Sequence, residues 1–180
     1  MECCNDRARA VLVRTGRLDL SRWFTERARA LDLETTPMDP VEIANGPRFD
    51  GYAFWSTKDS VSGAFHQHVA VALVPTPRPW EAAAYVGFGN WNDCPESAVH
   101  VALAHRWYQQ WGAEVFALAA DQAEMYVWRP PHTAREAAGI AEQQYLYASD
   151  NVLQGNPDLD TREKYAGALI DYHSWQFWWD

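Results

Sequence analysis

A helix followed directly by a pair of short strands, all within residues 95–131, is the feature that most constrains the fold of this chain. Pro95 suits the first position of a helix, and Gly112 is a typical residue at the end of one. Asp121-Gln122 then supplies a tight turn between two segments rich in β-forming side chains, and Pro130-Pro131 prevents the second of them from continuing. The predicted elements are a helix over 95–111 and strands over 113–120 and 123–128.

Capping residues and apolar spacing predict three further helices. Asp19 precedes the first helix. Thr133 with Glu136 forms a capping box before the second, and Asp160 precedes a third that carries Tyr165, Leu169 and Tyr172. The predicted helices run over 20–32, over 134–148 and from Asp160 onward, with a short helical element over 80–88 and a loop over 35–47.

Three more strands are predicted from β-branched and aromatic residues. Residues 51–55 and 64–74 form a hairpin, and Pro75 ends its second strand. Beyond His68 both faces of that strand are apolar, which is typical of a central strand. The last strand is expected over residues 175–179.

Together these elements predict an α+β fold: a two-layer sandwich of a mainly antiparallel sheet with helices on one face. The order β-α-β-β-α-β matches a ferredoxin-like sandwich with an added N-terminal helix, although another sheet order stays open. We expect residues 1–48 to form a helical leader packed on the main domain, and residues 49–180 to form a single α+β domain.

Charge and composition narrow the function classes. The chain has 180 residues and a net charge of -9. Residues 37–180 carry eight basic and eighteen acidic side chains, about -10, which argues against nucleic acid or an anionic membrane as partner and favours a basic protein. No apolar run approaches the roughly 20 residues of a membrane helix, and the three cysteines show no disulfide or metal spacing. We expect a cytoplasmic protein without a cofactor.

Several unusual strings occur along roughly residues 75–180. They are Pro79-Trp80-Glu81, Gly89-Asn90-Trp91-Asn92-Asp93-Cys94-Pro95, Gly112-Ala113-Glu114, Pro130-Pro131, Glu142 with Tyr145, Asp150, Gln154-Gly155 and Trp175-Gln176-Phe177-Trp178-Trp179-Asp180. Together these strings resemble the bacterial family called domain of unknown function 4253, and the resemblance implies a bacterial protein but no activity. One departure is that Tyr147-Ala148-Ser149-Asp150 has no cysteine just before the aspartate, where the family is associated with one.

The loop over 90–95 is the first candidate site, because an amide, an acid and an indole gather at a helix start. Cys94 in this loop is either a nucleophile activated by the helix dipole or a capping or buried thiol, since no histidine lies among its nearest residues to act as a base. Asp121 and Glu124 with Asp150 and Asp180 could supply paired carboxylates, or be ordinary turn and surface residues.

The histidines give no firm metal site. His66 and His68 share one strand face and could bind zinc with Asp93 or Glu124, but they equally suit the exposed end of a hairpin, and we predict no metal.

Ten tryptophans are the most disproportionate part of the composition. Large aromatic side chains dominate binding hot spots, so we expect a protein-binding module, such as an immunity-type inhibitor of a basic toxin or effector. The alternative is a hydrolase-like enzyme or small-ligand domain built around the 90–95 loop, which requires Trp91, Asn92, Asp93, Glu124 and Asp150 to line one pocket. The predicted binding residues are Trp91, Asn92, Asp93, Glu124, Tyr145, Asp150, Gln154, Trp175, Trp178, Trp179 and Asp180.

Overall fold

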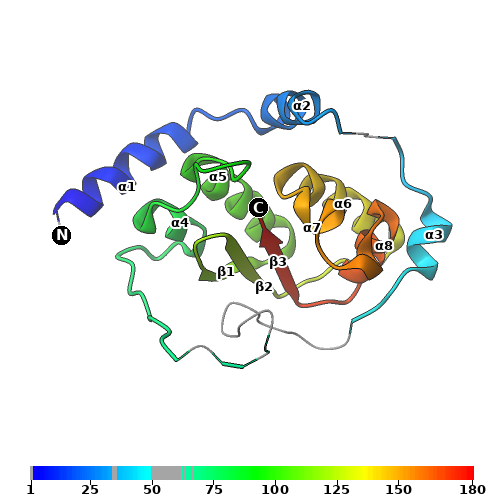
Figure 1. Cartoon of the computed structure of the whole chain (residues 1–180). Helices are drawn as coiled ribbons and strands as arrows, with labels where there is room; N and C mark the ends of the chain where they lie inside the picture. Colours follow the sequence, from blue (N-terminus) through cyan, green and yellow to red (C-terminus); the bar gives the residue numbers. More distant parts are fainter. Residues whose placement is uncertain (1, 34–35, 50–61, 63, 66) are drawn as a thin grey trace.

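The computed structural model describes residues 2–33, 36–49, 62, 64, 65 and 67–180 (Figure 1). Three strands, β1 (Ala113–Leu118), β2 (Gln122–Val127) and β3 (Ser174–Trp178), form one antiparallel sheet in the order β1-β2-β3, so the α+β class is confirmed. In chain order the elements are α1 (Glu2–Thr15), α2 (Leu20–Ala30), α3 (Pro40–Asn45), η1 (Pro79–Glu81), α4 (Ala82–Val86), α5 (Ser97–Trp111), β1 (Ala113–Leu118), β2 (Gln122–Val127), α6 (Ala134–Tyr147), α7 (Asp150–Leu153), η2 (Pro157–Leu159), α8 (Arg162–Leu169) and β3 (Ser174–Trp178).

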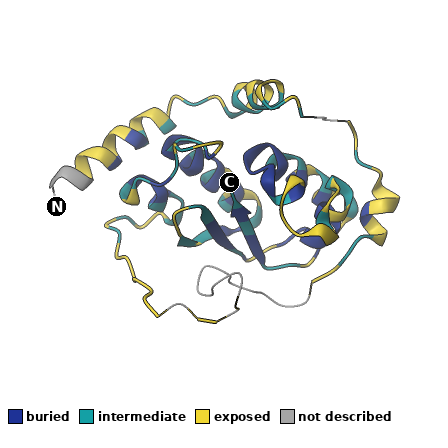
Figure 2. Ribbon diagram, in the orientation of Figure 1, coloured by how far each residue is buried: buried dark blue, intermediate teal, exposed yellow. Residues whose placement is uncertain are grey.

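An aromatic layer joins the sheet to helices α5 and α6. Trp107 of α5 stacks on Phe177 of β3 with ring centroids 5.4 Å apart. It also meets Tyr147 of α6 edge-on at 5.2 Å and Trp175 at 5.9 Å. Figure 2 shows the strands and the inner sides of these helices among the most buried parts of the chain. Such ring pairs stabilise a core beyond the area that they bury.

Several predictions that rest on local signals are confirmed. Asp19 accepts hydrogen bonds from Ser21 N and Arg22 N at the start of α2. Thr133 and Glu136 form the predicted capping box of α6, and Gly112 ends α5 with a left-handed φ of 64°. A short helical element also occupies the region predicted over 80–88, as η1 and α4.

The strand predicted over 64–74 is wrong for its described residues, which form no regular strand. Val71 and Leu73 are 89% and 96% exposed, so the apolar side chains have no neighbouring layer to pack against. Strand propensity reflects such packing more than an intrinsic backbone preference. The ferredoxin-like order is therefore not confirmed. Residues 51–55, the other half of the predicted hairpin, lie outside the described residues.

The loop predicted over 35–47 contains a helix, α3. Asp39 accepts a hydrogen bond from Val41 N, and Pro40 occupies the first turn. Ile43 is fully buried, where α3 packs against α6 and α8. Tertiary contact therefore stabilises a helix of one and a half turns that would be marginal by itself.

Two helix starts differ from the predictions. Helix α5 begins at Ser97, because Pro95 O accepts a hydrogen bond from Asn90 N and so belongs to the preceding loop; Cys94 is not its cap. Helix α8 is capped by Thr161, whereas Asp160 bonds Lys164 Nζ at 2.6 Å.

The N-terminal helices lie against the rest of the fold. Helix α1 packs on α4 and α5 through Ala8 and Val11, and Thr15 Oγ1 donates to Ala98 O at 3.3 Å. The division of the chain into two parts at residue 48 stays a prediction. None of the helices formed by the described residues is long and apolar enough to cross a bilayer.

Candidate functional site

The loop over residues 87–96 has a constrained backbone. Asn90 N donates to Pro95 O at 2.8 Å, and Cys94 N donates to Trp91 O at 2.9 Å. Gly87, Gly89, Asn90 and Asn92 all adopt positive φ angles, which glycine and asparagine tolerate better than other residues. A Cβ atom at Gly89 would collide with Pro95 O and with His100 Nε2. The residue types of this loop therefore suit one tight conformation.

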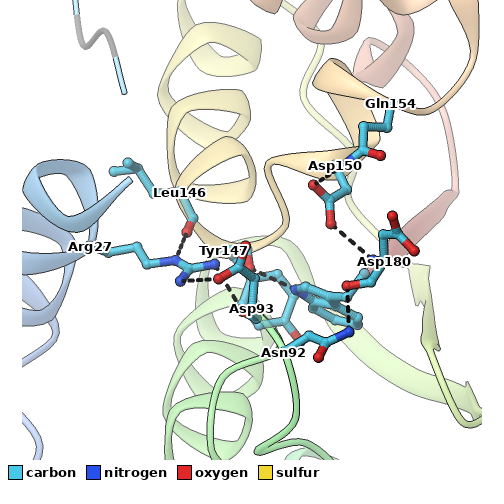
Figure 3. Close-up of polar contacts among 9 residues, drawn as sticks. Arg27, Asn92, Asp93, Leu146, Tyr147, Asp150, Gln154 and Asp180 are labelled. Carbon is cyan, nitrogen blue, oxygen red and sulfur yellow. Dashed lines mark hydrogen bonds and ion pairs between the residues drawn. The ribbon is translucent and has the colours of Figure 1, made fainter. Parts of the chain in front are cut away.

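Segment 178–180 lies across this loop and is held from both sides. Asn92 Nδ2 donates to Asp180 O, and Asp180 N donates to Asp150 Oδ2, each at 3.0 Å (Figure 3). Gln154 Nε2 donates to the other oxygen of Asp150 at 3.2 Å, which orients that carboxylate. The backbone of Asp180 is therefore positioned by two side chains from different elements.

A second set of bonds ties β3 to its neighbours. Trp178 N donates to Asn151 Oδ1 at 2.9 Å, and Asn151 Nδ2 donates to Gln176 O at 2.6 Å. Trp178 Nε1 donates to Asp121 Oδ2 at 3.3 Å, and Trp179 N donates to Asp121 O at 3.1 Å. The turn between β1 and β2 is thereby joined to segment 178–180.

The loop over 87–96, segment 178–180 and the turn between β1 and β2 border an open groove of about 550 Å³, which we call the indole groove. A smaller cavity of about 320 Å³, the apolar cavity, adjoins it, because Trp91 and Ala120 line both. The volume of the indole groove falls within the range of small-ligand pockets. The indole groove is lined by Trp91, Asn92, Ala120, Asp121, Trp178, Trp179 and Asp180. The apolar cavity is lined by Val86, Gly87, Phe88, Gly89, Trp91, Leu118, Ala119 and Ala120.

The indole groove is acidic. Asp121 and Asp180 contribute carboxylates, and none of the described residues that line it is basic. The neighbouring acid Asp93 is instead paired: its Oδ1 lies 3.8 Å from Arg27 NH1, and its carbonyl oxygen accepts from Arg27 NH2 at 2.8 Å (Figure 3). Arg27 Nε also donates to Leu146 O at 3.2 Å, at the end of α6. Asp121 and Asp180 therefore leave negative charge at the indole groove, whereas the charge of the neighbouring Asp93 is balanced by Arg27.

The structure brings together part of the predicted site. Trp91, Asn92, Trp178, Trp179 and Asp180 all line the indole groove, and Asp150 and Gln154 support it from behind. The five residues that the enzyme hypothesis requires in one pocket are not together. Asp93 pairs with Arg27, and Asp150 accepts a hydrogen bond from the backbone N–H of Asp180. Glu124 is 1% exposed and lies opposite Gln176 in the sheet, on the strand positions that alternate with those of the aromatic layer.

Two other predicted binding residues lie away from the indole groove. Trp175 is buried in the aromatic layer against Trp107. Tyr145 is also buried, with the Arg162 guanidinium 5.8 Å from its ring centroid. Both were predicted from strings of the family, and a string does not reveal which of its residues are structural.

Sequence reasoning missed a buried polar chain directly behind the loop. Cys94 Sγ lies 3.5 Å from His100 Nε2, and His100 Nδ1 lies 2.6 Å from the Tyr147 hydroxyl. The sequence argument that no histidine is close to Cys94 therefore fails in the folded chain. The end of the loop and the first turn of α5 bring His100 into contact with Cys94. Only the spacing of six residues could have suggested this contact.

Cys94, His100 and Tyr147 have the protonation states of residues buried in a core. Burial raises the pKa of the Cys94 thiol to about 12, although Arg27 and a backbone bond from Asn90 oppose the shift. Burial also lowers the pKa of His100 to about 3 and raises that of Tyr147. At neutral pH the pair is a neutral thiol beside a neutral imidazole. Neither residue is among the described residues that line the two cavities.

The remaining described histidines form no larger ligand set: His132 contacts one carboxylate, that of Asp171, and His173 Nδ1 bonds the backbone oxygen of Val127. His68 is exposed, and His66 lies outside the described residues. His105 stacks on Trp80 with ring centroids 4.6 Å apart. Within the part of the chain that the structure describes, no group of three histidine, cysteine or acidic side chains is placed to hold a metal ion.

Comparison with known proteins returns one match. The family described as a domain of unknown function, number 4253, matches residues 70–180, which include every residue that lines the indole groove and the apolar cavity. No curated protein and no solved structure matches the chain.

Proposed function

Because the chain belongs to the domain of unknown function 4253 family, whose description states no activity, we propose from its own geometry that it is a protein-binding module for a basic partner. The observation that carries this proposal is the indole groove, where tryptophan side chains and two aspartates meet without a basic residue among the described lining residues. A basic toxin or effector bound by an immunity-type inhibitor is a partner of this kind.

Charge and aromatic surface have separate parts in such binding. The charge of about -10 over residues 37–180 speeds encounter with a basic protein. Tryptophan side chains then supply affinity, because a rigid indole buries a large area with little loss of side-chain freedom. Hydrogen bonds between the three segments fix the shape of the groove before the partner arrives, which lowers the entropy lost on binding.

Site-specific photocrosslinking in an extract of the source organism tests the proposal. A benzophenone side chain at the exposed position Ala120, which lines both cavities, should crosslink a basic protein, and 0.5 M salt, at a Debye length of roughly 4 Å, should reduce the yield. The matched control carries the same group at Thr25, which is exposed on α2. Crosslinks to the same proteins from both positions, or to acidic proteins alone, would contradict the proposal.

The alternative is a hydrolase-like enzyme or small-ligand domain at the same loop. The 3.5 Å contact between Cys94 and His100, with Tyr147 behind the imidazole, favours it, because a base oriented by a third group is the usual arrangement around a nucleophile. Burial of both groups opposes it. Iodoacetamide at pH 7.5 distinguishes the two: intact-mass analysis of the wild type and Cys94→Ala should show no alkylation assignable to Cys94, whereas rapid labelling of Cys94 would support the enzyme.

A further inference from the structure

We infer that the indole groove binds an arginine side chain of the partner, and that the apolar cavity takes an apolar side chain next to it in the same extended segment. This inference rests on the proposed protein-binding function and specifies the chemistry that the partner presents. It follows from three features of the groove: its carboxylates, the attachment of those carboxylates, and the cavity beside it.

The pairing of indoles with carboxylates selects a guanidinium. An arginine side chain stacks its flat face on an aromatic ring and directs a fork of N–H donors to carboxylate oxygens. A lysine ammonium is a compact charge that holds its water more strongly and has no flat face. The indole groove offers the carboxylates of Asp121 and Asp180 beside the rings of Trp91 and Trp178, so both properties of the guanidinium have partners.

Both carboxylates belong to residues that are already positioned in the free protein. Trp178 Nε1 bonds one oxygen of Asp121, and Asn92 and Asp150 hold the backbone of Asp180 on its two sides. An arginine therefore meets one carboxylate that is already oriented, that of Asp121, and a second that projects from a fixed backbone, which reduces the ordering cost of binding.

The apolar cavity extends the site by one side chain. The described side chains that line it are aliphatic or aromatic and none carries a charge, while backbone polar groups share its accessible surface. Trp91 and Ala120 form a wall common to both cavities, so a segment that fills one passes directly to the other. Because successive side chains of an extended segment point to opposite sides, an arginine followed after one residue by leucine presents both to the same surface.

Capped hexapeptides test this inference on the full chain. The probe peptide contains the sequence Arg-Ser-Leu between glycine and serine residues, and its binding is followed by NMR through the indole N–H signals of Trp91 and Trp178, assigned with Trp-to-Phe variants. We expect replacement of arginine by citrulline, which is isosteric and uncharged, to weaken binding at least about tenfold, or about 1.4 kcal/mol. Lysine in place of arginine and serine in place of leucine should each weaken it severalfold.

Two protein variants locate the effect. Asp121→Asn keeps an oxygen for the Trp178 bond but removes the charge, and should weaken the arginine peptide about tenfold while leaving citrulline binding unchanged. Asp158→Asn removes an exposed acid outside the groove and should leave the affinity within twofold of the wild type. Equal effects of the two variants would overturn the placement of the arginine in the indole groove.

The outcomes separate this inference from the proposed function. Equal affinity for the arginine, lysine and citrulline peptides, or no binding of the arginine peptide, would overturn the inference. A basic protein crosslinked through Ala120 would still support the proposed function in those cases. Absence of both peptide binding and groove-specific crosslinks would remove both.

Discussion

The indole groove and the buried chain of Cys94, His100 and Tyr147 both involve the 87–96 loop, and each combines aromatic with polar side chains. In the buried chain, each polar group faces another polar group and burial keeps all three neutral. In the groove, the carboxylates of Asp121 and Asp180 remain at a cavity. The difference shows that aromatic and polar residues become a binding surface only where the fold leaves their polar groups accessible.

The largest expected effect comes from Gly89, which separates the two regions. Gly89→Ala places a Cβ against Pro95 O and His100 Nε2 and forces alanine to a φ of 92°, so we expect a loss of roughly 3 kcal/mol in the free energy of unfolding. Urea unfolding measures it. Gly139→Ala, in α6 with open space around the position, is the matched control and should be neutral or stabilising by up to about 1 kcal/mol. Equal stability of the two variants would contradict the close packing behind the loop.

His100 should make the stability of the protein sensitive to acid. Its folded-state pKa of about 3 lies below the ordinary value of 6.5, so the unfolded chain binds a proton that the folded chain excludes. The contribution is fully present above pH 6.5 and is lost as the pH falls toward 3, by about 2 kcal/mol at pH 5. Unfolding measured between pH 7.5 and pH 5 should therefore show a smaller decrease for His100→Gln than for the wild type.

His105→Gln controls for the loss of an imidazole from the same helix. His105 stacks on Trp80 on the other side of α5 and is outside the buried chain. An unchanged pH dependence in His100→Gln would show that His100 is protonated in the folded protein, in conflict with its burial.

Arg27 connects the loop over 87–96 to α2 and α6, so its replacement should make that loop, and with it one wall of the groove, less firmly held. Its side chain is 15% exposed and donates to Asp93 O and Leu146 O. We expect Arg27→Gln to lower the free energy of unfolding by roughly 1–2 kcal/mol and to weaken the arginine peptide severalfold. Arg22→Gln removes an arginine that pairs with Glu26 within α2 and should change neither quantity. A loss of stability without any change in affinity would separate Arg27 from the groove.

Asn92 should give the smallest effect and distinguish backbone from side chain. Asn92→Gly keeps the left-handed backbone at φ 41° but removes the bond to Asp180 O, so stability should change by no more than about 0.5 kcal/mol while peptide affinity falls. Asn92→Ala adds an unfavourable backbone conformation and should cost about 1 kcal/mol. Identical unfolding curves for the two variants would mean that this backbone geometry is not needed.

Most helices were predictable because their signals lie within a few residues. Asp19 bonds the second and third residues after it, and Thr133 pairs with Glu136, so each cap is complete in its own segment. The strand predicted over 64–74 was wrong because its apolar pattern carries no information about a packing partner. Helix α3 was missed for the opposite reason, since Ile43 is buried by helices far along the chain.

The candidate site divides in the same way. The indoles and the unusual strings marked the 90–95 loop and segment 175–180, and residues of both line the groove. Asp121 was predicted as a turn residue and as one of four candidate carboxylates, and Arg27 was not considered at all. Their contacts with Trp178 and Asp93 join residues 57 and 66 positions apart.

The sequence by itself determined that α2, α5, α6 and α8 form, where β1 turns into β2, and that the composition is acidic and rich in tryptophan. These properties depend on neighbouring residues or on the composition, so they can be obtained without the tertiary structure. Tertiary structure alone decided that Asp121 and Asp180 meet at one groove, and that Cys94 faces a histidine rather than solvent. Such contacts depend on how distant segments pack, and packing reflects the free energy of the whole chain rather than of any one segment.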